Sequence, residues 1–375
     1  MKWENKKFID FIQLQRGHDL TREQFIDGPY PVVSSTSIMG YHNQYKADGP
    51  GVVIGRSGTL GKAQYINDNY WPHNTTLYVK DYKGNYPRFV YYFLMNFSTD
   101  KHGGGSAVPT LNRNTLSSIS IRVPDFTTQK RIADILSAYD DLIENNQKQI
   151  KLLEEAAMWL YKEWFVKLRF PGHEKTKIED GVPEGWKLTR VKRMGQVITG
   201  KTPSTAIVEN YGEDIPFVKI PDMHGVIYPL KTEVKLSERG ANTQKNKFLP
   251  PKSMVSCIAT VGLVCITHEV CQTNQQINSI VLNDEDHLYY MFFKMKGIKS
   301  LLEGVGSNGA TMTNVNKTKF ENIELLKPEN EILKKFNNLV EPFFSNILAL
   351  SKQNEKLKEA RDKLLSKLMS GEIEV

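Results

Sequence analysis

The sequence is poor in cysteine, and the spacings that bind metals are missing. Its 375 residues include three cysteines, Cys257, Cys265 and Cys271, with no CxxC pair and no paired histidines beside them. Disulfide frameworks and zinc sites need such spacings. We therefore expect reduced core thiols, no metal site and a cytoplasmic protein, because thiols stay reduced in the cytosol.

Long apolar runs are missing as well. No apolar run follows residues 1–5, so we expect no signal peptide. The longest apolar stretch, residues 254–266, is interrupted by Ser256, Thr260 and Gly262 and is too short to span a bilayer. These absences predict a chain that does not associate with membranes.

Catalytic constellations are also lacking. The sequence has no Asn-Pro-Pro-Tyr-like motif for amino-methyl transfer, no glycine-rich strand-to-helix turn for a methyl donor, and no Ser/His/Asp or Cys/His set. Residues 195–202 (GQVITGKT) match the phosphate-loop pattern, but the preceding residues 190–194 are not an apolar strand. Asp222, Glu233 and Lys235 resemble the two carboxylates and the lysine of a metal-dependent nuclease site, but this short pattern is degenerate. We expect a binding protein, not an enzyme by itself.

Two long stretches carry an apolar seam at helical spacing. Steps of four and three residues from Ile132, and again from Phe336, reach apolar positions for more than four heptads each. The predicted seam consists of Ile132, Leu136, Tyr139, Ile143, Ile150, Leu153, Leu160, Trp164, Phe336, Val340, Phe343, Ile347, Leu350, Leu357, Leu364 and Leu368. The first helix, capped by Thr127 or Thr128, would be about 55 Å long. We expect the two helices to pack on each other as an antiparallel coiled coil.

The stretches between these helices repeat each other. Trp3 and Gly17 recur as Trp186 and Gly200, and residues 74–77 (NTTL) are aligned with residues 274–277 (NQQI). The separation of matching positions drifts slowly along the chain, which is typical of a duplicated domain with variable loops. The expected domains are 1–125 and 172–327, with helical segments at 126–171 and 328–375. Both globules mix strands and helices, which predicts an α/β (α+β) fold whose strand order the sequence leaves open.

Basic and polar residues in glycine-rich loops are candidates for contact with a polyanion. The net charge is +7, and most of the excess lies in the two globules. Arg and Lys neutralise phosphates, while Arg, Asn and Gln read base edges. The candidates for DNA contact are Arg16, Arg56, Lys62, His73, Asn74, Ser106, Arg113, Lys201, Lys219, Lys245, Lys247, Gln275, Gln276, Asn308, Asn314 and Lys317. For any one of them, a solvated loop side chain is the more ordinary interpretation, and it is the matched pair of clusters that favours DNA contact.

Several short runs of the sequence are distinctive: residues 198–204 (ITGKTPS), 232–240 (TEVKLSERG), 259–262 (ATVG), 273–277 (TNQQI) and 355–373 (EKLKEARDKLLSKLMSGEI). The last run, with residues 128–132 (TQKRI) of the first helix, is the most specific. In these runs, and over essentially its whole length, the chain resembles the specificity (S) subunit of type I restriction–modification enzymes.

The resemblance implies two target-recognition domains, each reading one half of a bipartite target in double-stranded DNA. The coiled coil would set the half-site spacing and dock two methyltransferase (M) subunits. A restriction motor–nuclease (R) subunit would join them. S-adenosylmethionine, ATP and Mg²⁺ would then bind the partner subunits and none of them this chain. With the domains up to about 50 Å apart, the half-sites would be centred at most about 15 base pairs apart.

Three other functions fit parts of the pattern. The chain could be a nuclease or methyltransferase in its own right, which would turn over DNA when purified alone. It could be a linker protein whose globules bind protein, and its binding would then lack the steep salt dependence of DNA contacts. It could also be a specificity subunit of another modification system.

Overall fold

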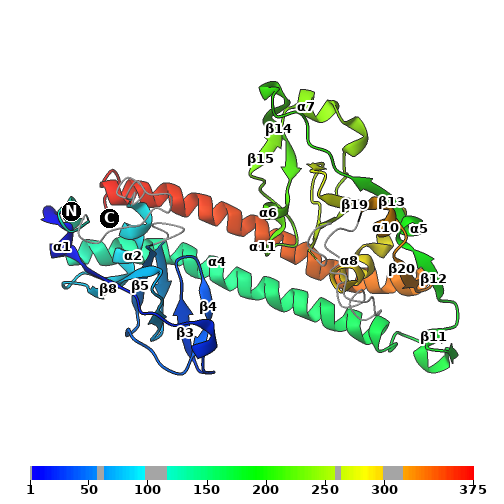
Figure 1. Ribbon diagram of the computed structural model, residues 1–375, viewed down its shortest axis with the longest axis horizontal. Coiled ribbons are helices and arrows are strands. Elements are labelled where there is room, and N and C mark those ends of the chain that lie inside the picture. Colours follow the sequence, from blue (N-terminus) through cyan, green and yellow to red (C-terminus); the bar gives the residue numbers. More distant parts are fainter. Residues whose placement is uncertain (1, 57–62, 98–115, 258–262, 299–315) are drawn as a thin grey trace. The chain divides into compact units, whose positions relative to one another are not determined.

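The computed structural model describes residues 2–56, 63–97, 116–257, 263–298 and 316–375. It divides into two compact units, one made of Met1–Asn145 with Glu355–Val375 and the other of Asn146–Asn354. Each unit holds one globular part and one half of each of two long helices, α4 (Phe126–Tyr161) and α11 (Asn330–Ser370) (Figure 1). The predicted fold class, two similar α/β domains with two long helices between them, is confirmed.

Three small sheets build the globular part of the first unit. The first pairs β1 (Trp3–Lys7) antiparallel with β9 (Ser120–Pro124). The second has the antiparallel order β2-β8-β5-β6, and the third has the order β4-β3-β7 with β3 and β7 parallel. Their strands are β2 (Gln13–Arg16), β3 (Tyr30–Val33), β4 (Ile38–His42), β5 (Gly51–Gly55), β6 (Ala63–Ile66), β7 (Trp71–Pro72) and β8 (Thr76–Asp81). β5 is buried along its whole length, as an inner strand of apolar residues should be.

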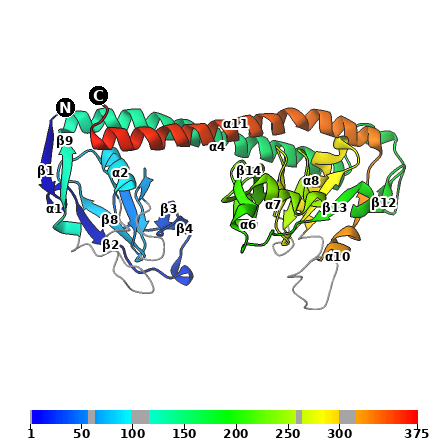
Figure 2. The same cartoon turned by 90° about the horizontal axis from the view of Figure 1, so that it is seen from above.

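One helix joins this globular part to the long helices. α2 (Pro87–Asn96) starts with proline at its first turn, where a missing N–H costs nothing. Its buried Phe89 shares a core with Phe8 and Phe11 of α1 (Phe8–Phe11). The same core includes Ile132 and Leu136 of α4, and Leu365 and Leu368 of α11. Figure 2 shows α2 between the four-stranded sheet and the two long helices. The first domain is therefore anchored on both helices.

The second unit repeats this topology strand for strand. β12 (Lys187–Arg190) pairs with β20 (Glu324–Lys327), and the other sheets have the orders β13-β19-β16-β17 and β15-β14-β18. Again the last two neighbours, β14 and β18, are parallel. The strands are β13 (Gly195–Thr199), β14 (Tyr211–Val218), β15 (Val234–Leu236), β16 (Met254–Cys257), β17 (Val264–Ile266), β18 (Gln272–Thr273) and β19 (Ile277–Leu282). Two domains with one strand order confirm that the chain is duplicated.

Short helices and a hairpin complete this unit. The larger helix, α8 (Leu288–Lys296), is almost entirely buried and corresponds to α2. The hairpin β10 (Ile178–Glu179) and β11 (Val182–Pro183) follows the end of α4. The other helices described in this unit are α5 (Val191–Met194), α6 (Ile220–Met223), α7 (Glu238–Asn242), α10 (Lys317–Glu321) and the single turns η4 (His173–Lys175), η5 (Val208–Asn210), η6 (Lys245–Lys247) and η7 (Glu285–His287). The single turn η1 (Arg22–Gln24) belongs to the first unit.

The register of the strands corrects one detail of the repeat. β3 pairs Val33 with Pro72, whereas β14 pairs Val218 with Thr273. Because Val33 and Val218 correspond, Pro72 corresponds to Thr273. The alignment of Asn74 with Asn274, taken from the sequence, is therefore wrong by one position. Asn74 corresponds to Gln275.

The ends of the long helices differ from the prediction. Asp125, and neither Thr127 nor Thr128, caps α4, because its Oδ1 accepts a hydrogen bond of 3.0 Å from the Thr128 N–H. This bond lowers the pKa of Asp125. α4 ends in the π-helical turn η3 (Lys162–Val166). α11 contains Pro342, which removes a helical hydrogen bond, yet the helix continues because Val340 and Phe344 are fully buried on either side.

Within each unit the two long helices run in opposite directions. In the first, Asp140 contacts Arg361. In the second, Asn146 contacts Asn354, and the rings of Tyr161 and Phe336 are 6.4 Å apart. Rising numbers on α4 meet falling numbers on α11, which is antiparallel packing. Among the helices of the described residues, none is both long and apolar enough to cross a lipid bilayer.

Candidate nucleic-acid interface

A tight turn at one end of the four-stranded sheet gathers polar side chains in the first domain. The Gly17 N–H donates to the carbonyl of Thr76 at 3.0 Å, and the His18 N–H donates to the carbonyl of Pro72 at 2.8 Å. A Cβ on Gly17 would lie 2.1 Å from the His73 carbonyl oxygen, so only glycine allows this approach. We call residues 16–19 together with 73–76 the first turn cluster.

The second domain contains the same arrangement. The Gly200 N–H donates to the carbonyl of Ile277, and the Lys201 N–H donates to the carbonyl of Thr273, both at 3.0 Å. A Cβ on Gly200 would lie 2.2 Å from the Asn274 carbonyl oxygen. Residues 199–202 together with 274–277 form the second turn cluster. Two diverged domains thus keep one steric requirement at the same place.

An amide side chain occupies the same position in both clusters. In the first, the Asn74 Nδ2 donates a short hydrogen bond to Asp19. In the second, the hydroxyl of Thr202 donates to the Oε1 of Gln275 at 2.5 Å. Asp19 and Thr202 correspond to each other, because each is the second residue after the shared glycine. Asn74 therefore keeps its whole carbonyl oxygen and one N–H, and Gln275 keeps both N–H groups and one oxygen lone pair.

The other candidates of the first domain that the structure describes lie around this turn. The Arg56 N–H donates to the carbonyl of Thr75 at 2.9 Å, so that strand β5 ends beside the cluster. Arg16 is half exposed and lies 4.0 Å from a carboxylate oxygen of Asp19. The His73 Nδ1 lies 3.1 Å from the Thr75 hydroxyl. Two cations and an amide thus meet at one corner of the sheet.

In the second domain most candidates also meet at the turn. Exposed Lys201, Gln275 and Gln276 belong to the cluster itself. Lys219 follows β14 directly, and the preceding carbonyl of Val218 accepts from the Asn274 N–H at 3.4 Å.

Lys245 and Lys247 lie close to this cluster because they follow Gln244, whereas Lys317 lies away from it. Gln244 donates to the Lys201 carbonyl at 2.8 Å, which brings the following Lys245 and Lys247 close to the turn. Lys317 lies on α10, where it pairs with Glu321, and no contact joins it to the cluster in the described part of the chain.

Five candidates lie outside the described residues. They are Lys62, Ser106, Arg113, Asn308 and Asn314.

Residues that the sequence did not single out complete the two clusters. Asp19 and Thr202 orient the amides, and the match of Gly17 with Gly200 would have revealed them as a pair. Lys46 lies over the Trp71 ring, 5.2 Å from its centroid, and adds a cation beside His18. Burial, and then Lys46, lowers the pKa of His18, which keeps this imidazole neutral at pH 7. His18 is therefore not one of the charges that would face a phosphate.

The two catalytic look-alikes have structural roles. Gly195–Thr199 of the phosphate-loop pattern is strand β13, paired antiparallel with β19, so no loop surrounds a phosphate. Asp222 accepts from the N–H groups of Lys219 at 2.7 Å and Glu233 at 3.0 Å, and these bonds occupy both carboxylate oxygens. Across the described ranges, no group of three His, Cys, Asp or Glu side chains could hold a metal ion.

Cys265 and Cys271 are buried core groups. Cys265 donates to the Val226 carbonyl at 3.2 Å, and burial raises the pKa of its thiol to about 12. Burial raises the pKa of Cys271 equally, to about 12. Both are free thiols, and Cys257 lies at the end of β16.

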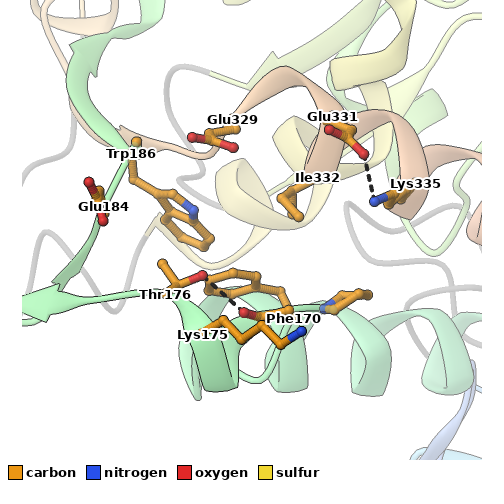
Figure 3. Close-up of a pocket in the computed structure, with 12 residues that line it drawn as sticks. Phe170, Lys175, Thr176, Glu184, Trp186, Glu329, Glu331, Ile332 and Lys335 are labelled. Atoms are coloured by element: carbon orange, nitrogen blue, oxygen red, sulfur yellow. Dashed lines mark hydrogen bonds and ion pairs between the residues drawn. The ribbon is translucent and has the colours of Figure 1, made fainter.

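A cavity of about 580 Å³ lies elsewhere in the second unit, where α11 begins (Figure 3). Phe170 and Trp186 face each other at one side, with ring centroids 5.1 Å apart. The carboxylates of Glu184, Glu329 and Glu331 line it as well. Lys175 and Lys335 line it too, and Lys335 pairs with Glu331. No residue of either turn cluster lines this cavity, so it does not extend the candidate interface.

The predicted seam residues all lie on the packed faces of the helices. Ile132, Leu136, Ile143, Phe336, Val340, Ile347 and Leu368 are buried. The others, Tyr139, Ile150, Leu153, Leu160, Trp164, Phe343, Leu350, Leu357 and Leu364, are partly buried. Beside them, Phe344 and Leu365 are more deeply buried than Phe343 and Leu364, because each domain packs on that side of α11.

Comparison with known proteins agrees with this geometry. The family model for the type I restriction modification DNA specificity domain matches residues 1–155 and 183–359, which is one match for each repeat. The type I restriction enzyme HindI specificity subunit of Haemophilus influenzae is 32% identical over 355 residues, covering 76% of this chain and 77% of that protein. The MjaIX specificity subunit of Methanocaldococcus jannaschii is 30% identical over 306 residues, covering 76% and 69%.

A solved structure has the same fold. The S subunit of the type I restriction–modification system of M. genitalium aligns over 98% of this chain and 96% of its own, with a TM-score of 0.60 and 14% identity. The duplicated domains, their identical strand order and the two family matches lead to one assignment. This chain belongs to the family of type I restriction–modification specificity subunits, and its two globular domains are target-recognition domains.

Proposed function

We propose that each domain reads one half of a bipartite sequence in double-stranded DNA through its turn cluster. The observation that carries this proposal is the shared glycine contact, which holds a polar turn at the same corner of two otherwise diverged domains. Arg16, Arg56, Lys201, Lys219, Lys245 and Lys247 would contact phosphates. Asn74 and Gln275 would read base edges, because amides pair with bases in the major groove.

The orientation of the two amides suggests different bases for the two halves. Asp19 accepts a hydrogen bond from the amide nitrogen of Asn74. The free amide oxygen of Asn74 therefore suits a base donor such as the amino group of adenine or cytosine. Thr202 binds the amide oxygen of Gln275, so its nitrogen suits an acceptor such as guanine O6 or thymine O4. The two half-sites would then differ in sequence.

The rest of the machine would be supplied by other chains. We propose that the long helices set the spacing between the half-sites and dock two methyltransferase subunits, which a motor–nuclease subunit would join in the cytoplasm. S-adenosylmethionine, ATP and Mg²⁺ would bind those subunits. Support for a chain without its own catalysis comes from Asp222 and residues 195–199, whose groups serve the fold.

The test is to map methylated adenines in DNA from cells that carry this chain with its partner subunits. Asn74→Ala should relax one position of one half-site, and Gln275→Ala should relax one position of the other. Loss of a good amide–base pair lowers discrimination by about 1–3 kcal/mol. Asn5→Ala is the matched control, because Asn5 is an exposed amide on β1, outside the sheet that carries the cluster. An unchanged motif in both variants would refute the assignment of the clusters, and turnover by the purified chain alone would refute a non-catalytic role.

A further inference from the structure

A buried polar contact lies in the otherwise apolar seam of the second unit. The Asn146 Nδ2 donates to the Asn354 Oδ1 at 2.9 Å and to the Gln353 Oε1 at 3.0 Å. Asn146 is 2% exposed and Asn354 is 4% exposed. A buried Asn pair lowers the stability of a coiled coil but fixes the partner and the register.

A charged contact lies in the seam of the first unit. Arg361 bonds Asp140 at 2.5 Å, and both side chains are only 16% exposed. The hydroxyl of Tyr92 on α2 donates to the other carboxylate oxygen at 2.6 Å. The carboxylate of Asp140 thus connects the first domain to both long helices.

The duplication shows that these contacts are not symmetric. α4 and α11 correspond when fully buried Ile132 and Leu136 are matched with fully buried Phe336 and Val340. In this alignment Asn146 corresponds to Leu350, and Asn354 corresponds to Ile150. Asp140 corresponds to Phe344, whose ring stacks on Tyr289 at 4.2 Å, and Arg361 corresponds to Ala157. One copy thus has polar groups where the other has apolar ones.

Because of this asymmetry, the pair of α4 with α11 differs in its contacts from a pair of two α4 helices or of two α11 helices. If α4 of a second chain replaced α11, Ile150 would lie opposite Asn146, and Ala157 would lie opposite Asp140. If α11 of a second chain replaced α4, Leu350 would lie opposite Asn354, and Phe344 opposite Arg361. Either self-pair would bury asparagine amides without partners, which is costly. A pair of two α4 helices would also remove the Arg361 cation from Asp140, whereas in a pair of two α11 helices Arg361 would keep only Asp362 of its own helix.

We propose that Asn146, Asn354, Asp140 and Arg361 form a pairing code that makes the seam of α4 accept α11 and reject α4 of a second copy of this chain. The code has a use during synthesis. Residues 162–329 separate the two helices, so α4 is complete on the order of ten seconds before α11 at about 5–20 residues per second. A symmetric seam could pair with α4 of a neighbouring chain in that interval. The inference does not depend on DNA binding.

The experiment lets the helices choose their partners after the full chain has folded. A protease site is inserted between Asp180 and Gly181, two exposed residues in the turn of the β10–β11 hairpin. Purified folded chain is cut there, and isotopically heavy and light preparations are mixed in urea, which is raised until heavy and light fragments exchange. After the urea is removed, native mass spectrometry counts pairs of unlike fragments and pairs of like fragments.

The code predicts that unlike pairs exceed like pairs at least about tenfold, since one unsatisfied buried polar group already accounts for such a factor. Asn146→Leu with Asn354→Ile gives each position the residue of the other copy and should lower this excess about tenfold. Ile150→Asn should instead promote pairs of the N-terminal fragment, because Asn146 would then lie opposite an asparagine of the second copy. Ile143→Val with Ile347→Val is the matched control, because these residues correspond to each other and affect every pairing alike.

Three results would overturn the proposal. The first is a statistical mixture of like and unlike pairs from the unsubstituted chain. The second is an excess that Asn146→Leu with Asn354→Ile leaves as large as the control does. The third is failure of Ile150→Asn to raise the pairing of N-terminal fragments. Each readout counts pairs without DNA, so it is independent of the proposed function.

Discussion

Gly200→Ala should disrupt the second turn cluster while the rest of the chain stays folded. The added Cβ would lie 2.2 Å from the Asn274 carbonyl oxygen and 2.3 Å from the Thr273 carbonyl oxygen. Both are main-chain atoms, so no side-chain rotation relieves the overlap. The turn must move by about 1 Å to restore ordinary van der Waals contact.

The cost follows from the contacts that such a shift breaks. The N–H groups of Gly200 and Lys201 donate at 3.0 Å to the carbonyls of Ile277 and Thr273, and a shift of that size lengthens both bonds beyond hydrogen-bond range. At about 1 kcal/mol for each bond, the second domain should lose about 2–3 kcal/mol of stability. Hydrogen exchange followed by mass spectrometry should show faster exchange in peptides that cover residues 195–202 and 272–280.

Gly297→Ala is the matched control in the same domain. Gly297 ends α8, and its nearest contact for a new Cβ is 3.5 Å, an ordinary distance. We expect its urea midpoint to change little. Gly17→Ala should reproduce the Gly200 effect in the first domain, where the Cβ would lie 2.1 Å from the His73 carbonyl oxygen. Equal midpoints for Gly200→Ala and Gly297→Ala would refute the close-approach argument.

Three further predictions concern the helices and the thiols. Arg361→Ala should lower the free energy of unfolding by about 2–3 kcal/mol, because Asp140 keeps its burial and loses its cation. Adding Asp140→Phe and Tyr92→Phe to this variant makes the contact apolar, as it is at Phe344 and Ala157 of the second unit. The triple variant should regain most of the lost stability in urea unfolding. A still larger loss would contradict the reasoning. Removing one heptad from each long helix should shorten the spacer in the methylated motif by about 3 base pairs and leave the bases unchanged, since seven residues rise about 10.5 Å. An unchanged spacer would disprove that role. Because burial raises the pKa of Cys265 and Cys271 to about 12, neither thiol should react with a disulfide reagent at pH 8 until urea unfolds the chain. Rapid labelling of native Cys265 would contradict this.

The long helices and the duplication were accessible from sequence because they depend on local or repeated patterns. Apolar steps of three and four residues predicted helices at positions now seen as α4 and α11. The recurrence of Trp3 as Trp186 and of Gly17 as Gly200 predicted two similar domains. The helix cap was misassigned, because Thr127, Thr128 and Asp125 are all good caps by type and only the geometry selects Asp125.

The candidate site was predictable in composition but not in its geometry. Basic and amide residues in loops could be collected from the sequence, whereas Lys317 does not join the turn cluster. The strand register shows that Asn74 corresponds to Gln275. An error of one position in aligning the two repeats cannot be detected from the sequence, because the loops between them vary in length. Asp19 and Thr202 were missed as site residues, because their shared position two residues after Gly17 and Gly200 is their one mark in the sequence and their contacts with the amides are not encoded locally.

Periodicity, duplication and motif runs are properties of the chain, so the two domains, the two seams and the family could be inferred without coordinates. Strand order, the meeting of residues 16–19 with 73–76, and the partners of Asn146 and Asp140 became known from the folded structure. Those contacts join side chains that are far apart in the sequence, as Asn74 is from Asp19 and Arg361 is from Asp140. Their pairing depends on which strands and helices lie together, and local propensity does not encode it.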